Sequence, residues 1–313
     1  MLLRDYPQSL ILTGPTGSGK SRVALELAER LDAEIVSMDS MALYRRMDIG
    51  TAKASLEDRR RVPHHLLDAL DPWESASVAW WLERARASCC DIAQRGKRPL
   101  IVGGTPLYLK ALLHGLFDGP PAEEAIRRRL QVEADSIGGA VLHQRLAAID
   151  PVSASRLHVN DIRRVIRALE VWELTGRPLS TWQTQWKPAK RDETPLESPF
   201  PASRCLCLDL PRDVLYARID ARVERMIAEG LVEEVRALRQ LEYPPSREAL
   251  QALGYKETFA FLDGAADLTE TIRLIQTRSR NFAKRQMTWF RHLPLLRIER
   301  PELTFAAWRL TMV

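Results

Sequence analysis

The sequence predicts an α/β protein in which an inserted helical domain interrupts a parallel-sheet core. Two observations predict this class: short apolar runs alternate with helical patterns near the start, and a long middle stretch contains only helical patterns. The length agrees, because 313 residues exceed the roughly 150 expected for one domain. We expect the first part of the core at residues 1–118, the insertion at 119–199, and the core completion with basic C-terminal helices at 200–313.

The core elements are predicted in chain order from their apolar patterns. Strands are expected at four apolar runs, 10–12, 34–38, 100–102 and 204–210. A helix is expected after the first strand, because apolar residues recur four apart at Val23, Leu27 and Leu31. Further helices are expected at 214–241 and 268–292. Alternating strands and helices are typical of a parallel sheet with helical crossovers.

The insertion opens at Gly119-Pro120-Pro121, a sequence that disfavours regular structure. Inside it we expect three helices, at 122–132, 140–149 and 161–175. A polar, proline-containing stretch at 187–201 is typical of a connector and ends the insertion. We interpret the whole segment as a helical domain set into the α/β core.

Composition excludes several classes of protein. Hydrophobic residues make up 45% and charged residues 28%, as in ordinary globular chains. No stretch approaches the roughly 18 apolar residues that span a bilayer, and residues 1–7 are too short and polar for a signal peptide. The four cysteines, at 89, 90, 205 and 207, lack the spacing of a zinc or redox pair, so we expect structural thiols. We therefore expect a cytoplasmic protein without a membrane partner.

Positive charge is concentrated near the C-terminus. The net charge of the chain is only +5. Residues 278–300 nevertheless hold seven basic residues against the single acid Glu299. Such a concentration is typical of a surface that binds a polyanion.

A glycine-rich loop carries the strongest chemical signal. Residues 14–21 match G-x-x-x-x-G-K-S/T and lie between a predicted strand and a predicted helix, as a phosphate-binding P-loop requires. Small residues let backbone N–H groups turn toward a phosphate, and the helix N-terminus adds positive potential. Lys20 supplies a mobile cation, and Ser21 is a candidate Mg²⁺ ligand. The candidate phosphate-binding residues are Gly14, Thr16, Gly17, Ser18, Gly19, Lys20 and Ser21.

The loop recognises a diphosphate group without selecting a nucleotide. P-loop enzymes that hydrolyse or transfer phosphate usually end a second core strand in an aspartate that holds Mg²⁺ through water. Here the run at 100–102 ends in Gly103-Gly104-Thr105, and the chain has no Asn-Lys-x-Asp guanine-reading motif. The sequence therefore disfavours a GTPase.

An acidic residue follows the second predicted strand. Asp39 stands where the strand C-termini of a parallel sheet face the same crevice as the P-loop. A carboxylate there can bind metal, accept a proton as a general base, or cap the next segment. Position alone leaves these three roles open.

Several segments, standing in family order, resemble the tRNA dimethylallyltransferases. The resemblance covers about residues 9–292 and is far more specific than a P-loop alone. The segments are Gly14–Ser21, Asp39–Lys53, Pro63–Leu66, Gly103–Leu109, Asp161–Glu170, Leu253–Glu257 and Ala283–Trp289. The fold that the resemblance implies is the P-loop NTPase-like core already predicted.

The resemblance also implies a reaction and its chemistry. Members of this family transfer a dimethylallyl group from its diphosphate to the exocyclic amine of adenosine 37 in the anticodon loop of tRNA, releasing diphosphate. The P-loop would then hold the prenyl diphosphate and not ATP. By analogy Asp39 is the general base, while Thr105 and Arg222 join Lys20, and Ser21 with Mg²⁺, in holding the departing diphosphate.

The RNA-binding residues are expected on separate segments. On the last predicted helix, a turn of 100° per residue places Arg280, Lys284 and Arg291 within roughly 40° of one another. A solvated basic face is the alternative for this ridge and for the pair Arg163 and Arg167. Family analogy adds the remaining expected tRNA contacts, which are Ser40, Met41, Ala42, Arg127, Arg164, Gln251, Gly254 and Lys256.

Two residues depart from the family pattern. Ala42 stands where the family usually has Gln, so a side-chain amide contact to RNA is absent or supplied elsewhere. Pro106 follows Thr105 where a small or apolar residue is usual, and proline pushes the residue before it toward an extended conformation. We expect both changes to affect tRNA handling or loop rigidity and not the reaction type.

Two other functions compete with this interpretation. A small-molecule kinase would bind ATP in the same loop, but the acid missing after the third strand and the basic C-terminal helix argue against it. A non-catalytic RNA-binding P-loop protein is the other, and the placement of Asp39 and Thr105 argues against that. We expect a monomer that binds tRNA and dimethylallyl diphosphate, with Mg²⁺.

Overall fold

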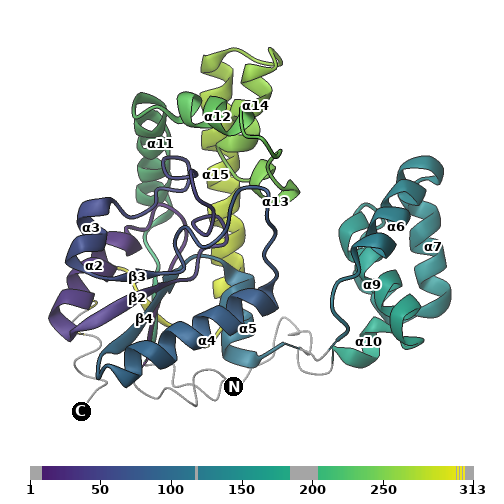
Figure 1. The fold of residues 1–313 in the computed structure, drawn as a ribbon, viewed down its shortest axis with the longest axis horizontal. Helices are drawn as coiled ribbons and strands as arrows, with labels where there is room; N and C mark the ends of the chain where they lie inside the picture. The colour runs from purple at the N-terminus through teal and green to yellow at the C-terminus, as the bar shows by residue number, and fades with distance from the viewer. Residues whose placement is uncertain are drawn as a thin grey trace. The chain divides into compact units, whose positions relative to one another are not determined.

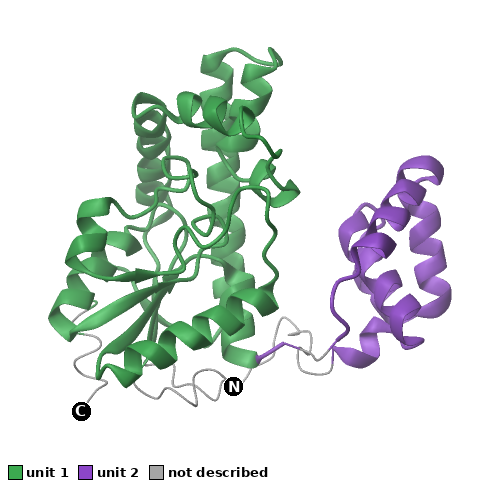
Figure 2. Cartoon of the chain, in the orientation of Figure 1, with its two compact units in different colours: residues 1–114, 191–313 green, residues 115–190 purple. Residues whose placement is uncertain are grey.

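The computed structural model describes residues 9–116, 119–183 and 204–300, together with residues 302, 304 and 306. The chain divides into two compact units, shown in Figure 2: Met1–His114 with Arg191–Val313, and Gly115–Lys190. The expected insertion at 119–199 overlaps the second unit, although its boundaries differ from 115–190. The expected connector at 187–201 lies outside the described residues.

The first unit is built on a six-stranded sheet with strand order β3-β2-β4-β1-β5-β6. Every neighbouring pair is parallel, which confirms the predicted fold class. The strands are β1 (Leu10–Thr13), β2 (Ala33–Ser37), β3 (His64–His65), β4 (Arg98–Gly103), β5 (Cys205–Leu208) and β6 (Leu296–Ile298). The sequence predicted four of them and missed β3 and β6, because these two short outer strands are not continuous buried apolar runs.

Helices cover both faces of the sheet (Figure 1). Residues alternate along each strand, so Ile11 and Val36 join the larger core with α4, whereas Leu12 and Ile35 pack with α2 on the opposite face. The helices are α2 (Lys20–Leu31), α3 (Leu56–Arg61), α4 (Val78–Gln94), α5 (Pro106–His114), α11 (Arg212–Ala228), α12 (Leu231–Arg239), α13 (Arg247–Leu250), α14 (Tyr255–Leu262) and α15 (Leu268–Phe290). Burial on both faces explains why the strands are continuous apolar runs.

One predicted helix is two helices. The expected helix at 214–241 ends with α11 and resumes as α12 after Gly230. Gly230 has a φ of 100°, a left-handed conformation that suits glycine and stops a helix. Apolar residues continue at helical spacing across the break, which explains why periodicity alone predicted a single element.

The second unit is helical throughout its described residues. Its helices are α6 (Glu124–Ile137), α7 (Gly139–Ile149), α8 (Pro151–Arg156), α9 (Ile162–Thr175) and α10 (Leu179–Trp182). The three predicted helices correspond to α6, α7 and α9, while α8 and α10 are too short to show periodicity. The unit has its own apolar core, centred on Leu130, Leu142, Leu146, Val165 and Leu169.

The cysteines are free thiols, as expected. Burial raises the pKa of Cys89 and of Cys207 to about 12, and it raises the pKa of Cys205 as well. Thiols of this kind are inert packing residues. Among the described helices, none has the length and apolar character needed to cross a membrane.

Candidate active site

The P-loop follows β1 at the C-terminal edge of the sheet. Gly17 and Gly19 have φ values of 81° and 85°, in the left-handed region that glycine adopts without strain. Gly19 also caps α2, whose first residues are Lys20 and Ser21. Backbone N–H groups at this helix start have no intrahelical acceptor, so the loop is suited to an anion.

Two helices that are distant from the P-loop in the sequence, α11 and α15, support it. A Cβ atom on Gly17 would lie 2.8 Å from Ile219 of α11, so the loop and this helix are in close contact. Ile219 forms a small buried cluster with Leu215 of α11 and Ala283 of α15. The hydroxyl of Ser18 is buried and has no hydrogen-bond partner among the described residues, whereas its backbone N–H donates to Pro15.

The ends of β2 and β4 place Asp39 and Thr105 together. The Thr105 hydroxyl oxygen accepts the backbone N–H of Ser40 at 3.1 Å, and the Thr105 N–H donates to the Met38 carbonyl at 3.3 Å. Pro106 is the first residue of α5, a position that favours proline and accommodates this departure from the family pattern. Lys20 also reaches this edge, because its Nζ lies 3.4 Å from the point where a Cβ on Gly104 would be.

Asp39 caps its own loop with one carboxylate oxygen. Oδ1 accepts the backbone N–H groups of Met41 at 2.9 Å and Ala42 at 3.4 Å. In the described part of the chain, no hydrogen bond engages Oδ2. The capping role therefore occurs, and it leaves one oxygen available for a metal or a proton.

The charges around Asp39 do not balance. The pKa of Lys20 is lowered to about 8, chiefly by burial; the charge of Asp39 opposes this shift and the charge of Arg222 adds to it. Burial also lowers the pKa of Arg222, against the attraction of Asp39. Both side chains are half-buried, and neither cation has an ion pair among the residues described, so two partly desolvated cations share one carboxylate. This arrangement favours the binding of an anion.

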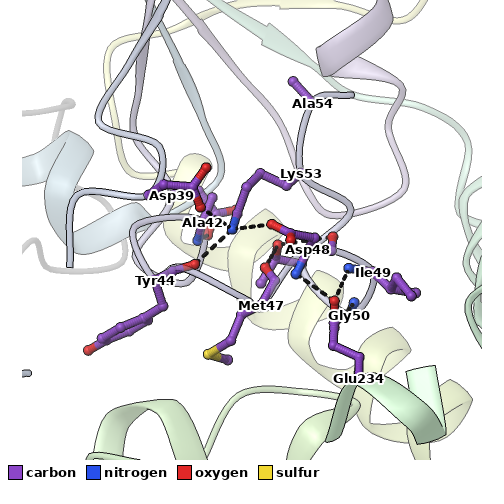
Figure 3. Close-up of polar contacts among 12 residues, drawn as sticks. Asp39, Ala42, Tyr44, Met47, Asp48, Ile49, Gly50, Lys53, Ala54 and Glu234 are labelled. Carbon is purple, nitrogen blue, oxygen red and sulfur yellow. Dashed lines mark hydrogen bonds and ion pairs between the residues drawn. The ribbon is translucent and has the colours of Figure 1, made fainter. Parts of the chain in front are cut away.

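The segment after Asp39 is held by two charged side chains that the sequence did not single out (Figure 3). Lys53, with a side chain 1% exposed, donates to the Tyr44 carbonyl at 2.7 Å and to Asp48 and Asp68 at 2.5 and 2.7 Å. Glu234 of α12 accepts three successive backbone N–H groups, from Asp48, Ile49 and Gly50, at 2.8, 2.9 and 3.2 Å.

The Glu234 contact extends to α14. The Tyr255 hydroxyl donates to Glu234 at 2.5 Å. A Cβ on Gly50 would lie 2.3 Å from the Tyr255 ring, so only glycine fits there. In the sequence, the only sign that these residues matter was that segments 39–53 and 253–257 both resemble one family. That resemblance did not show that the two segments are in contact.

A cavity of about 570 Å³ adjoins this segment. Its lining includes Asp48, Ile49 and residues 52–56 of this segment, together with Arg222, Arg225 and Met226 of α11. The structure thus brings Arg222 close to both Asp39 and the cavity.

The expected RNA-binding residues differ in their surroundings, because some bind carboxylates inside the protein and others are exposed. In the helical unit, Arg127 and Arg167 both bind Glu170, which is 0% exposed, at 2.9 and 2.7 Å. Arg164 pairs with Asp161 at 3.3 Å, and Arg163 is exposed. Both alternatives weighed for Arg167, an RNA contact or a solvated face, overlooked this buried carboxylate.

The three residues of the predicted basic ridge, Arg280, Lys284 and Arg291, also differ in whether a carboxylate binds them. Arg280 donates to Asp220 of α11 at 2.5 Å. Lys284 and Arg291 are exposed, and no ion pair engages them within the described ranges. The structure therefore leaves two of the three ridge residues available for phosphate.

The remaining expected contacts lie in unit 1. Ser40 is half-buried, Met41 packs partly against the core, and Ala42 is buried, so the Ala42 side chain is not presented on the surface. Gln251 and Lys256 are exposed and bond to each other at 3.1 Å.

Gly254 begins α14 near these two residues. Its φ is 88°, and its N–H donates to Glu257 at 2.8 Å.

A Mg²⁺ ion bound at this site would need ligands from the substrate as well as from the protein. In the ranges described, no group of three or more His, Cys, Asp or Glu residues is placed to hold a metal. Mg²⁺ commonly keeps several waters and binds one or two protein oxygens plus substrate phosphates. The hydroxyl of Ser21, on the first turn of α2, fits this kind of site.

Comparisons with known proteins agree with one another. The family model described as IPP transferase matches residues 42–293. The tRNA dimethylallyltransferase of Geobacter metallireducens is 51% identical over 284 residues, covering 90% of this chain and 89% of that one. The tRNA dimethylallyltransferase of Geobacillus thermodenitrificans is 45% identical over 284 residues, covering 90% and 87%.

Solved structures show the same likeness. The tRNA isopentenylpyrophosphate transferase of Bacillus halodurans matches with a TM-score of 0.66 and 38% identity, covering 97% of this chain and 96% of that one. A eukaryotic dimethylallyltransferase acting on tRNA matches with a TM-score of 0.74 and 27% identity, covering 97% and 77%. These neighbours have a P-loop NTPase-like fold, which confirms the predicted core.

Proposed function

Since the chain belongs to the IPP transferase family and transfers a dimethylallyl group to tRNA, we propose the details of that reaction. The donor is dimethylallyl diphosphate, and the acceptor is the exocyclic amine of adenosine 37 in the anticodon loop. The products are the prenylated tRNA and diphosphate. The enzyme acts as a monomer in the cytoplasm.

The observation that carries this proposal is the unbalanced charge at the P-loop. Lys20 and Arg222 are both desolvated, and Asp39 neutralises only one of them. A diphosphate supplies the missing negative charge and restores the ordinary pKa of Lys20. Binding the leaving group in this way stabilises the charge that develops on it as the allylic bond breaks.

The transfer step requires one bond to break and one to form. The bond between the allylic carbon and the diphosphate oxygen breaks, and its electron pair leaves with the diphosphate. The adenine amine forms the new bond to carbon, and its proton passes to the free Oδ2 of Asp39. Lys20, Arg222, Thr105 and the P-loop N–H groups hold the departing diphosphate.

Thr16 has a smaller part in that binding than its neighbours. Its backbone N–H already donates to the side chain of Gln286 at 2.9 Å, so this N–H is not free to reach a phosphate. The Ser18 N–H likewise donates to the Pro15 carbonyl at 3.2 Å, so the P-loop N–H groups that serve the diphosphate are those of Gly17, Gly19 and Lys20. Thr16 has its hydroxyl left for the ligand.

Mg²⁺ would bind through Ser21 and the diphosphate. When bound, it neutralises diphosphate oxygens and so assists their departure. The P-loop geometry and the hydroxyl of Ser21 suit this role. An anticodon loop suits the acceptor role, because a base in a single-stranded loop leaves its stack at the lowest cost, about a few kcal/mol.

The test compares donors. The protein and unmodified tRNA are incubated with Mg²⁺ and either dimethylallyl diphosphate or ATP, and the RNA nucleosides are then weighed by mass spectrometry. We expect a gain of one dimethylallyl group on a single adenosine, mapped to position 37, with the prenyl donor alone. A gain in neither incubation would contradict the proposal and would leave the small-molecule kinase and the non-catalytic RNA-binding protein as the alternatives.

A further inference from the structure

Gln286 lies on the buried face of α15 and joins two loops of the active site. It is 3% exposed. Its amide oxygen accepts the backbone N–H of Thr16 in the P-loop at 2.9 Å, from a residue 270 positions away. Its amide nitrogen donates to the Gly104 carbonyl after β4 at 2.6 Å. Glutamine can make both bonds because its amide group offers an acceptor and a donor together.

The two loops serve opposite halves of the proposed reaction. Thr16 belongs to the loop that holds the donor diphosphate. Gly104 precedes Thr105, whose hydroxyl oxygen accepts the Ser40 N–H at 3.1 Å, and Ser40 follows Asp39. A continuous series of covalent and hydrogen bonds therefore runs from the P-loop through Gln286 to the acceptor side of the site.

The surroundings leave Gln286 little freedom to move. A Cβ on Gly104 would lie 2.8 Å from the Gln286 amide nitrogen and 3.0 Å from the Gly14 carbonyl, so the loops and the side chain are in close contact. One turn earlier on α15, Ala283 is fully buried against Leu215 and Ile219 of α11. The position of the amide is thus fixed by a packed helix and not by a mobile loop.

We propose that Gln286 is a positioning residue that sets the separation between the P-loop and the Asp39–Thr105 edge. This inference rests on the proposed transfer reaction. The allylic carbon and the amine must approach to about 3–3.5 Å, and a misplacement of about 1 Å from a distant mutation can lower the rate about 10²-fold. Loss of Gln286 therefore slows the transfer step while each substrate still binds to its own part of the site.

The test separates binding from transfer. Gln286→Met has a similar length and loses both hydrogen bonds, whereas Gln286→Glu keeps the acceptor for Thr16 and loses the donor to Gly104. For the Met variant we expect dissociation constants for dimethylallyl diphosphate and for tRNA, each measured alone, to change less than about threefold. The Glu variant places a carboxylate near Lys20 and should bind the donor more weakly, so only its rate at saturating donor is compared. The single-turnover rate at saturating concentrations should fall about 10²-fold in the Met variant, and the Glu variant should also be slower than wild type.

A matched control lies on the same helix. Gln276 donates to the Asp220 carbonyl of α11 at 3.5 Å, so Gln276→Met removes a contact between the same two helices away from the P-loop. We expect the Gln276→Met variant to transfer at the wild-type rate. Melting temperatures of every variant are recorded to check that each one folds. If the Met variant does not fold, the single-turnover rate of the Glu variant tests the proposal.

The proposal is overturned if both Gln286 variants transfer at the wild-type rate, or if donor affinity in the Met variant falls as much as the rate. The second result would make Gln286 a donor-binding determinant. A wild-type protein that transfers no dimethylallyl group would refute the proposed function itself, which the variants cannot do.

Discussion

At the scale of single residues, the site contains positive charge that the protein itself does not balance. Burying Lys20 and Arg222 beside a single carboxylate costs stability, because desolvation disfavours the charged forms. A ligand with negative charge removes this cost when it binds. Asp39 is placed differently, since one oxygen caps its loop and the other is free to act on a substrate.

The free oxygen of Asp39 leads to the first prediction. Asp39→Asn keeps the size and the capping acceptor but cannot take up a proton near neutral pH. Loss of a positioned base typically lowers a rate about 10² to 10⁴-fold. We expect a fall of that order in single-turnover transfer at saturating donor and tRNA, with both dissociation constants changed only severalfold.

The alternative roles of Asp39 predict different results for Asp39→Asn. A variant that transfers nearly as fast as wild type would exclude Asp39 as the base. If the rate and Mg²⁺ affinity fell together and high Mg²⁺ restored activity, Asp39 would be a metal-sphere residue.

The lowered pKa of Lys20 predicts a pH dependence of donor binding. In the proposed reaction the charged ammonium binds diphosphate, and in the free protein it loses its proton as the pH rises through about 8. Affinity for dimethylallyl diphosphate should be full below this pH and fall up to about tenfold per pH unit above it, with proton uptake on binding near pH 8. Calorimetry in buffers of different ionisation enthalpy measures both effects.

The control is Lys20→Arg, which stays charged and should lose this alkaline fall. Equal wild-type affinities at pH 7 and pH 9 would contradict the assignment of Lys20 to the diphosphate. Collapse of tRNA binding alone in Lys20→Ala would contradict it too.

At the scale of elements, α15 combines two functions on two faces. In Figure 1 it is the long yellow helix that runs from the region of α5 to that of α14. Its buried face, with Ala283 and Gln286, supports the P-loop. Its exposed face presents Lys284 and Arg291, while Arg280 is tied to Asp220. The helix thus joins the donor loop to a basic surface.

The exposed face predicts a specific salt dependence. If Lys284 and Arg291 each meet a phosphate, replacing both by Ala should weaken tRNA binding and reduce the log-log salt slope by about 0.7 to 0.9 per contact. Arg280→Ala should have a smaller effect, because its guanidinium already has a carboxylate partner. Binding is measured by titration at several salt concentrations.

Arg273→Ala on the same helix is the matched control, since it also removes one exposed positive charge, from a residue paired with Glu270. We expect its salt slope to equal that of wild type. A double Lys284 and Arg291 variant with an unchanged slope would show that this face meets solvent and not RNA.

At the scale of the whole molecule, the chemistry belongs to one unit. The P-loop, Asp39, Thr105, Arg222 and Gln286 all lie in unit 1, and the helical unit has a separate core. The helical unit contributes the exposed Arg163 and Arg164, and it uses Arg127 and Arg167 to neutralise its buried Glu170. We therefore expect the helical unit to bind RNA through surface charge and not through the catalytic groups.

This division predicts the effect of removing the helical unit. When a short Gly-Ser linker replaces residues 115–190, we expect donor affinity to stay within about threefold and tRNA affinity to fall about tenfold or more. Both affinities are measured at equilibrium at one salt concentration. Loss of donor binding would show that the site is not confined to unit 1, and unchanged tRNA affinity would remove the helical unit from RNA binding.

Local patterns in the sequence determined the core strands, the P-loop and the family. A strand buried on both faces is a continuous apolar run, and a P-loop needs glycines at fixed spacing, so both leave a signal within a few residues. The same local character explains the errors, because β3 and β6 are too short to show a period, and the apolar pattern continues across Gly230 although the helix stops there.

Only the tertiary structure decided which polar side chains are already engaged. Glu170 binds Arg127 and Arg167, Asp220 binds Arg280, and Gln286 reaches a loop 270 positions away. Apart from Arg167, which lies three residues before Glu170, these contacts join residues far apart in the chain, so neither spacing nor composition records them. A charged residue looks the same in the sequence whether its partner is a buried carboxylate or a phosphate, because its partner is chosen by packing in three dimensions.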